Sequence, residues 1–322
     1  MSKPTRHHIV PKCYLKSFTN TSGTLYVFPK AKEKKAYEAV PNNVAVRRHY
    51  YSIETESGEL DPKVEHTLSE LESIAEPILS DIKSHKDITT QQKQDLSVFI
   101  GIMHSRNPNF RSGVEEFMRQ NIEKIKESII RHSKDTDDII ADTPEVIVAL
   151  AGGKHKLKDW MIQNLKVVMT NNASIEHIGL GITISEILQK MHWKFIINDI
   201  PNMHFITSDN PCYTVNSGAN RVGYGVGIAL KDSTLHFPIS PNVFLIASHG
   251  DDSIKFVTLQ DKIKITRINS RTVRHAESEI YSSYKNKWIE QIHKKNKGFY
   301  FATLIQNIGP YQLMRRRLIK KA

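Results

Sequence analysis

The spacing of apolar residues changes near the middle of the chain, and this change limits the folds that the sequence can adopt. Between about 61 and 187, apolar residues recur at steps of three and four, which is the spacing of amphipathic helices. After His192 they gather in short runs separated by turn residues, which is typical of strands. The gaps between these runs are too short for helical crossovers, so the sequence predicts a mostly antiparallel sheet. The runs are 193–198, 203–208, 225–230, 234–240 and 243–248.

The segregation of helical and β-rich segments predicts an α+β fold. With 322 residues, of which 39% are hydrophobic, the chain can bury a sizeable core. We expect one domain spanning residues 1–322. Its parts are a small N-terminal α/β segment with a helix and a hairpin at 1–55, a helical region at 56–192, and a mostly antiparallel β-rich region with flanking helices and a basic tail at 193–322.

Several element boundaries can be placed from local signals. Asp61-Pro62 predicts a helix start, because Asp caps the first turn and Pro fits it. A second helix should begin near Thr90 and end before Pro108. The other regular segments we expect are helices at 11–18, at 114–132, from 144, from 157 to 187 and at 269–278, and strands at 23–28, 35–40, 49–53, 279–283 and 298–305.

The chain is basic, with a formal net charge of +11 from 45 Lys and Arg against 34 Asp and Glu. The positive charge is concentrated in four clusters: KAKEKK at 30–35, RR at 47–48, HKKNK at 293–297 and RRRLIKK at 315–321. The last cluster is expected to be a solvated tail. A charge surplus of this size favours a polyanionic partner, and nucleic acid more than a membrane surface. A basic protein that is merely soluble is the alternative.

The sequence favours a cytoplasmic location and no membrane partner. No stretch approaches the ~18 consecutive apolar residues of a membrane helix. The first residues lack the apolar segment of a secretion signal. The two cysteines, Cys13 and Cys212, form no CxxC motif and are expected to be reduced thiols.

Two adjacent histidines, His7 and His8, precede Ile-Val-Pro and a predicted helix. One interpretation is that their imidazoles cap this helix at Pro11. The HHIVP stretch also resembles the start of His-Asn-His nucleases, whose ββα-metal site binds a divalent cation. That resemblance implies that His7 is a metal ligand and His8 the general base, with NN at 42–43 and His49 as the remaining members. A neutral imidazole suits proton abstraction near neutral pH, and a metal ion neutralises charge that develops on phosphate.

A broader resemblance extends over two thirds of the chain. HHIVPKCYLKSF, GTLYVFPK, RRHYYS, VEHTLSELE, SRNP and FITSDNPC occur in this order. Together they resemble the domain of unknown function 4238 family of bacterial cytoplasmic proteins, which brings no known activity. The family's marked positions correspond here to His8, Pro11, Tyr14, Leu15, Tyr50, Glu65, Arg106, Pro108, Ser208, Asp209, Asn210 and Pro211.

Two helical segments carry polar candidates beside their apolar faces. Glu65 and Glu72 lie seven residues apart, so they share one face of a helix. They could bind a metal ion in a cleft, or form a solvated edge that favours the start of the helix. Arg106 lies in the last turn of the next helix, where it could satisfy terminal carbonyls or, with Arg111, bind phosphate.

The stretch Ser208-Asp209-Asn210-Pro211 follows an apolar strand. An Asx turn explains this stretch without any function, because Asp and Asn before Pro fold the chain back. Alternatively, a carboxylate and an amide held at a strand end can bind a metal ion or act as a base.

Three functions remain as hypotheses. The first is a nuclease or phosphodiesterase that depends on Mg²⁺ or Mn²⁺, in a defence or toxin context. The second is a nucleic-acid-binding protein without catalysis, and the third is an enzyme acting on a small nucleotide. In the first, the catalytic residues are His8, Asp209 and Arg106, and the metal ligands are His7 and Glu65. The residues expected to bind the substrate are Tyr14, Arg47, Tyr50, Arg111, Ser208 and Asn210.

Overall fold

The structure is a computed structural model. It describes residues 6–31, 33–48, 53–54, 60–61, 63–107, 173–216, 227–308 and 311–321, with isolated positions between 122 and 163. The chain divides into two compact units, one formed by Met1–Arg111 with Asn171–Ala322 and the other by Ser112–Thr170. Apart from isolated positions, the helices predicted at 114–132 and from 144, the first part of the helix predicted at 157–187 and most of the strand predicted at 49–53 lie outside the described residues. The helices and sheets of the described ranges belong to the first unit.

Three long helices form where the apolar spacing predicts them. They are α2 (Lys63–Lys83), α3 (Thr90–Ser105) and α8 (Ala173–Gln189). A capping box starts α3: the Thr89 hydroxyl accepts the Gln92 N–H at 3.2 Å, and the Gln92 side chain accepts the Thr89 N–H at 2.8 Å. In the part of the chain that the structure describes, no helix has both the length and the apolar character needed to cross a bilayer.

Two glycines let α3 and α8 pack with their backbones in contact. A Cβ added to Gly101 would lie 2.2 Å from the carbonyl oxygen of Gly181. A Cβ added to Gly181 would lie 2.8 Å from the Cα of Ile102. Because both neighbours are backbone atoms, a small side chain at either position would have to push the helices apart.

A five-stranded sheet in the order β12-β7-β11-β10-β9 forms the centre of the unit. All its pairings are antiparallel except β12 with β7, which is parallel. The predictions of an α+β fold and of a mostly antiparallel sheet are therefore confirmed. The strands are β7 (His192–Ile197), β9 (Tyr213–Asn216), β10 (Ser233–Pro238), β11 (Val243–Ser248) and β12 (Ile254–Thr258).

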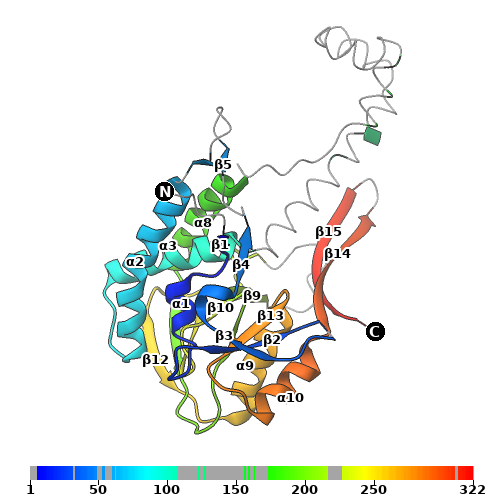
Figure 1. Ribbon diagram of the computed structural model, residues 1–322. Helices are drawn as coiled ribbons and strands as arrows, with labels where there is room; N and C mark the ends of the chain where they lie inside the picture. The colour runs from blue at the N-terminus through cyan, green and yellow to red at the C-terminus, as the bar shows by residue number, and fades with distance from the viewer. Residues whose placement is uncertain are drawn as a thin grey trace. The chain divides into compact units, whose positions relative to one another are not determined.

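A second sheet, in the order β3-β2-β13-β8, joins the two ends of the sequence (Figure 1). The hairpin predicted near the N-terminus forms, as β2 (Leu25–Pro29) pairs antiparallel with β3 (Tyr37–Ala39). The other edge of β2 pairs with β13 (Glu279–Ser282), which in turn pairs with β8 (Thr207–Ser208). The N-terminal segment therefore folds against the C-terminal region.

The remaining elements lie around these sheets. Helix α9 (Lys262–His275) and helix α10 (Lys287–Asn296) are neighbours near β13, and the hairpin of β14 (Phe299–Ile308) and β15 (Tyr311–Lys320) follows them (Figure 1). The short elements are β1 (Arg6–His8), α1 (Lys12–Lys16), the 3₁₀ turn η1 (Pro41–Asn43), β4 (Val46–Arg48), β5 (Ile53–Glu54) and β6 (Leu60–Asp61).

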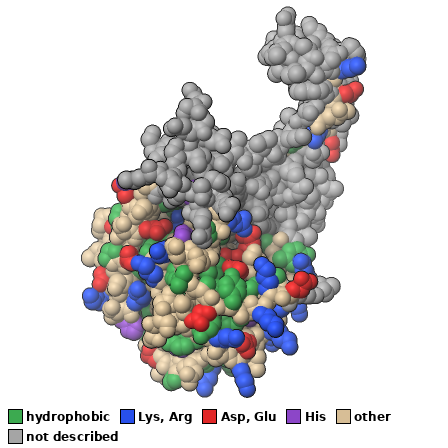
Figure 2. Space-filling view, in the orientation of Figure 1, with side chains coloured by type: hydrophobic (Ala, Val, Ile, Leu, Met, Phe, Trp, Pro, Cys, Tyr) green, Lys and Arg blue, Asp and Glu red, His purple; other side chains and the backbone are tan. Residues whose placement is uncertain are grey.

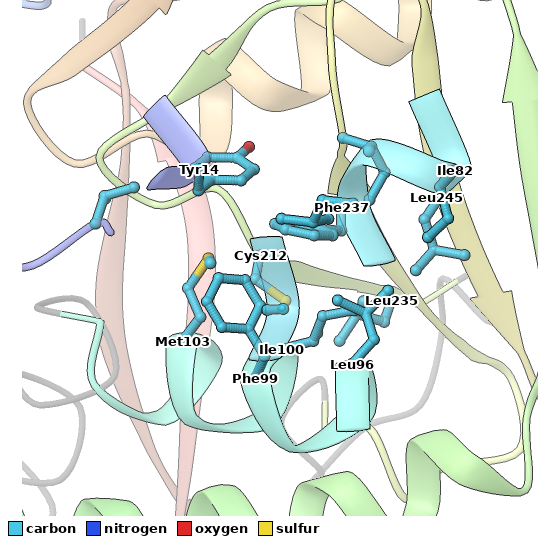
Figure 3. Close-up of a cluster of buried hydrophobic side chains, with 14 of the residues drawn as sticks. Tyr14, Ile82, Leu96, Phe99, Ile100, Met103, Cys212, Leu235, Phe237 and Leu245 are labelled. Atoms are coloured by element: carbon cyan, nitrogen blue, oxygen red, sulfur yellow. The ribbon is translucent and has the colours of Figure 1, made fainter. Parts of the chain in front are cut away.

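The largest core cluster fills the space between the helices and the five-stranded sheet. Figure 3 shows Tyr14 beside Phe237 and Phe99 beside Cys212, all of them buried. The ring of Tyr14 stacks on that of Phe237 with their centroids 5.1 Å apart. Residues from the start, middle and end of the chain therefore share one core.

The structure differs from the predicted boundaries in four places. Of 203–208 only Thr207–Ser208 is a strand, because the N–H of Phe205 bonds to the Pro241 carbonyl instead of a neighbouring strand. The described end of 225–230, residues 227–230, forms turns. Helix α9 begins before 269, since Asp261 caps it by accepting the N–H groups of residues 263 and 264. The basic run 315–321, expected to be a tail, lies largely in β15.

Because α3 and α8 are in backbone contact at Gly101 but not at Gly179, we expect replacing these two glycines by Ala to change the stability of the protein in opposite directions. Gly101→Ala should lower the free energy of unfolding by about 1–3 kcal/mol, because its methyl group would overlap the Gly181 carbonyl. Gly179→Ala, at an α8 position with open space around it, should raise that free energy by about 0.5–1 kcal/mol. Urea denaturation followed by circular dichroism measures both changes, and equal effects at the two positions would contradict the close contact.

Candidate functional site

The carboxylate of Asp209 holds a distant loop by three backbone hydrogen bonds. Its Oδ1 accepts the N–H of Glu277 at 2.8 Å. Its Oδ2 accepts the N–H groups of Ser278 at 2.7 Å and of Glu279 at 3.1 Å. Asp209 is only 5% exposed, and it follows β8 directly. One side chain therefore fixes the turn between α9 and β13.

Burial also changes the acidity of this carboxyl group. Burial raises the pKa of Asp209 to about 7, and the nearby Glu277 carboxylate raises it as well. The N–H groups of Ser278 and Glu277 act in the opposite direction, because they favour the ionised form. With this pKa, the carboxyl group of Asp209 titrates near neutral pH in the folded protein.

Asn210 connects the end of α3 to the end of α9. Its Oδ1 accepts a hydrogen bond from Asn107 Nδ2 at 2.6 Å, and its Nδ2 donates to the His275 carbonyl at 2.8 Å. The N–H of Asn210 bonds to the hydroxyl of Ser208 at 3.1 Å, so the side chain of Ser208 serves the local turn. Asn107, Ser208 and Asn210 are all buried.

Tyr14 and Arg106 contact other parts of the protein than Asp209. The hydroxyl of Tyr14, which is fully buried, lies 2.6 Å from Thr207 Oγ1 and donates to the Pro238 carbonyl at 2.8 Å. Burial raises the pKa of Tyr14 well above its usual value. Arg106 is 5% exposed, and its Nη2 lies 3.9 Å from Glu72 Oε1. These two side chains tie α1 to the sheets and α3 to α2.

The paired histidines lie in β1, next to β4. His7 is buried and lies opposite Arg47, whereas His8 is half-buried and lies opposite Val46. Arg47 Nη2 in turn contacts Glu277 Oε1 at 3.3 Å. The N-terminal β1–β4 pair is therefore linked through Arg47 to the loop that Asp209 holds.

Three of the predicted site residues fall outside what the structure describes. These are Tyr50, Arg111 and the side chain of Glu65. Among the described residues, no group of three or more His, Cys, Asp or Glu side chains is arranged to hold a metal ion. The described candidates that the structure brings together around residues 275–279 are Asp209, Asn210 and Arg47.

A cleft with a volume of about 1180 Å³ lies directly against this loop, and we call it the lysine cleft. Part of its wall is formed by Glu277, Ser278 and Glu279. Asp209 does not line the cleft, but its carboxylate accepts the backbone N–H groups of these three residues and so fixes the wall. Phe299 and Tyr300 contribute aromatic surface. Figure 2 shows Lys and Arg side chains gathered on the lower right of the described surface, near the position of α10 in Figure 1. The lysines that line the cleft are Lys30, Lys34, Lys294, Lys295, Lys297, Lys320 and Lys321.

The lysine cleft combines basic clusters that are far apart in the sequence. KAKEKK at 30–35, HKKNK at 293–297 and the end of RRRLIKK at 315–321 all contribute lining residues, and Arg47 from RR at 47–48 contacts the wall residue Glu277. The four clusters are visible in the sequence, but no sequence pattern predicts that they lie close together in the fold. Sequence reasoning also missed Asn107 as a site residue, although it lies within the SRNP stretch of the family resemblance.

Lys30 is half-buried, and its ammonium group bonds to the protein itself. Its Nζ donates to the carbonyls of Ala276 at 2.5 Å and Arg274 at 3.4 Å, at the end of α9. Burial lowers the pKa of Lys30 to about 8, although Asp209 and Glu277 raise it. Lys30 therefore supports the floor of the cleft, and the exposed lysines around it remain available to a ligand.

The raised pKa of Asp209 predicts a specific dependence of stability on pH. Between about pH 4 and pH 7, the folded state holds a proton that the unfolded chain has released. The free energy of unfolding of the wild type should therefore fall as pH rises through this window, by up to about 1.4 kcal/mol per pH unit, relative to the non-titrating Asp209→Asn variant.

Urea denaturation of both proteins at pH 4.5, 5.5, 6.5 and 7.5 measures this difference. A wild type that gains stability relative to Asp209→Asn over the same range would show that the three backbone N–H groups keep the carboxylate ionised throughout.

Comparison with known proteins places this arrangement in a family. No curated protein and no solved structure matches the chain. The family model described as "Protein of unknown function (DUF4238)" matches residues 6–286, a range that includes β1, the end of α3, Asp209 and the loop that Asp209 holds. The chain therefore belongs to the DUF4238 family of proteins of unknown function.

Proposed function

We propose that this protein binds nucleic acid, and that the lysine cleft holds the phosphate backbone. The observation that supports this most directly is the meeting of seven lysines from distant parts of the chain around one cleft. Only two acidic residues, Glu277 and Glu279, line the same cleft among the described residues. An excess of positive charge that is not neutralised by the protein itself favours a polyanion.

The size and chemistry of the cleft favour a polymer over a small nucleotide. Its volume of about 1180 Å³ exceeds the range of about 300–1,000 Å³ that is usual for small-molecule sites. Tyr300 is 39% exposed and lies beside the lysines, with Lys321 Nζ 5.5 Å from its ring centroid. Lysines that follow a backbone, with aromatic rings beside them, are typical of proteins that bind nucleic acid without reading its sequence.

Hydrolysis of the bound phosphodiester with Mg²⁺ or Mn²⁺ is a second candidate function. It is favoured by the carboxylate of Glu277 in the wall of a cleft suited to phosphate. The Oε2 atom of Glu277 is buried and has no hydrogen-bond partner among the described residues, so it can accept a cation. In this proposal His8 acts as the general base, with His7 and Glu65 as further ligands.

Removing lysines from the cleft should weaken binding through the loss of phosphate contacts. We expect Lys34→Ala/Lys294→Ala to bind a fluorescein-labelled oligonucleotide several-fold more weakly than the wild type. The slope of log K against log salt should become shallower by about 1.4–1.8 for two lost contacts. Fluorescence anisotropy at several salt concentrations measures both quantities.

The matched control is Lys194→Ala/Lys255→Ala, which removes two exposed lysines from the paired strands β7 and β12. It lowers the net charge by the same amount at a surface outside the cleft. If both double variants lose affinity equally, binding depends on net charge alone, and the proposal for the cleft is wrong.

The catalytic candidate is tested separately. In Mg²⁺ or Mn²⁺, we expect cleavage of the same oligonucleotide by the wild type, and a loss of about 10²–10⁴-fold in rate for His8→Ala, because a general base typically contributes that much. Binding by His8→Ala should be retained, because the lysines of the cleft hold the phosphate whereas the general base acts on the attacking water. Cleavage at the wild-type rate by His8→Ala would contradict the assignment of the base, and absence of cleavage by the wild type would contradict hydrolysis.

A further inference from the structure

A second basic hollow lies between α9 and α10, and we call it the arginine groove. Its volume is about 620 Å³. Two residues of α10, Gln291 and Lys295, line both this groove and the lysine cleft, so the two hollows adjoin across one helix. The other lining residues are Lys262, Ile263, Thr266, Arg267, Ser270, Arg271, Arg274, Trp288, Ile292 and Asn296.

Three arginines follow one face of α9 along the groove. Arg267, Arg271 and Arg274 are separated by four and three residues, which places them on successive turns of the helix. Their Cβ atoms are therefore about 5–6 Å apart from turn to turn. Guanidinium groups at this spacing can hold neighbouring phosphates of one strand, each by two parallel hydrogen bonds.

One of these guanidinium groups is already fixed in place. Arg274 Nε donates to Asn296 Oδ1 at 2.7 Å, and its guanidinium carbon lies 4.6 Å from the ring centroid of Phe299. Asn296 is itself 1% exposed, and its Nδ2 donates to the Ile292 carbonyl at 2.8 Å. Such support lowers the entropy that is lost when a ligand binds.

The charge of the groove is not neutralised by the described residues around it. Among them, the lining includes five basic residues and no acidic one. Within the described ranges, the one ion pair formed by α9 joins Lys264 to Asp261, and neither residue lines the groove. Arg267 and Arg271 are exposed to solvent. Five cationic groups that pair with no carboxylate in the described part of the chain make this groove suitable for an anionic chain.

Trp288 adds an aromatic surface to the same groove. The indole is half-buried, and its Nε1 donates to Thr266 Oγ1 at 3.3 Å, which fixes the ring between the two helices. An indole held beside phosphate-binding groups can stack on an unpaired base. A base in a duplex is already stacked and paired, so it cannot use this surface.

From these observations we propose that the arginine groove binds single-stranded nucleic acid, with phosphates on Arg267 and Arg271 and a base against Trp288. The proposal rests on the proposed function and adds the class of ligand and its path, which runs across α10 from the lysine cleft. Packed helices have axes about 8–10 Å apart, so the groove admits one strand, and a duplex would contact only its rim.

The test compares a single-stranded oligonucleotide with the duplex formed from it, at one ionic strength. We expect the wild type to bind the single strand at least about tenfold more tightly. Arg267→Ala/Arg271→Ala should weaken binding of the single strand about tenfold. It should therefore also reduce the ratio of single-strand affinity to duplex affinity. In a Trp160→Phe background, the single strand should also quench tryptophan fluorescence, and this quenching should be lost when Trp288→Phe is added, because the remaining Trp193 is fully buried.

The charge-matched control is again Lys194→Ala/Lys255→Ala, which should keep the preference for the single strand. Equal affinity of the wild type for single strand and duplex would overturn the inference, and so would wild-type binding by Arg267→Ala/Arg271→Ala. In either case the proposed function stands if Lys34→Ala/Lys294→Ala still weakens binding of both probes. If the wild type binds neither probe, the proposed function fails as well.

Discussion

The three backbone hydrogen bonds of the Asp209 carboxylate are the contact on which the arrangement of this unit depends. They fix the loop at 277–279, which leads from α9 into β13 and forms a wall of the lysine cleft. The same loop receives Arg47 from the N-terminal strands, and Asn210 joins its start to the end of α3. A buried carboxylate with these donors keeps three distant parts of the chain in register, because leaving any of the donors unpaired would be costly.

Holding this wall in place concentrates positive charge. Lysines from both ends of the sequence surround the lysine cleft, and the arginines of α9 continue the basic surface beyond α10. Like charges repel, so such a concentration opposes folding unless a ligand neutralises it. Repulsion between the like charges around such a hollow lowers the stability of the folded state. A loss of stability of this kind is typical of a binding surface. This is why we attribute to these residues the binding of a polyanion.

The helices and the first hairpin could be predicted from the sequence because their signals are local. The apolar spacing of α2 and α3 and the alternation of β2 lie within a few turns of the chain. The candidate site could be predicted only in part. Asp209 was singled out, but its partners lie 68 to 70 residues further along, and no local pattern encodes such a pairing. The basic clusters were visible as well, whereas their meeting depends on β2 pairing with β13.

The location of the ligand is the central claim, and hydrogen–deuterium exchange of the full chain with and without a single-stranded oligonucleotide tests it most directly. The account predicts that the ligand slows exchange in peptides that cover α9, the loop at 277–279 and α10, where the lysine cleft and the arginine groove adjoin. Exchange in β7 and β12 should remain unchanged. Slower exchange confined to the α2–α3–α8 side of the unit, with none at α9 or α10, would contradict the account.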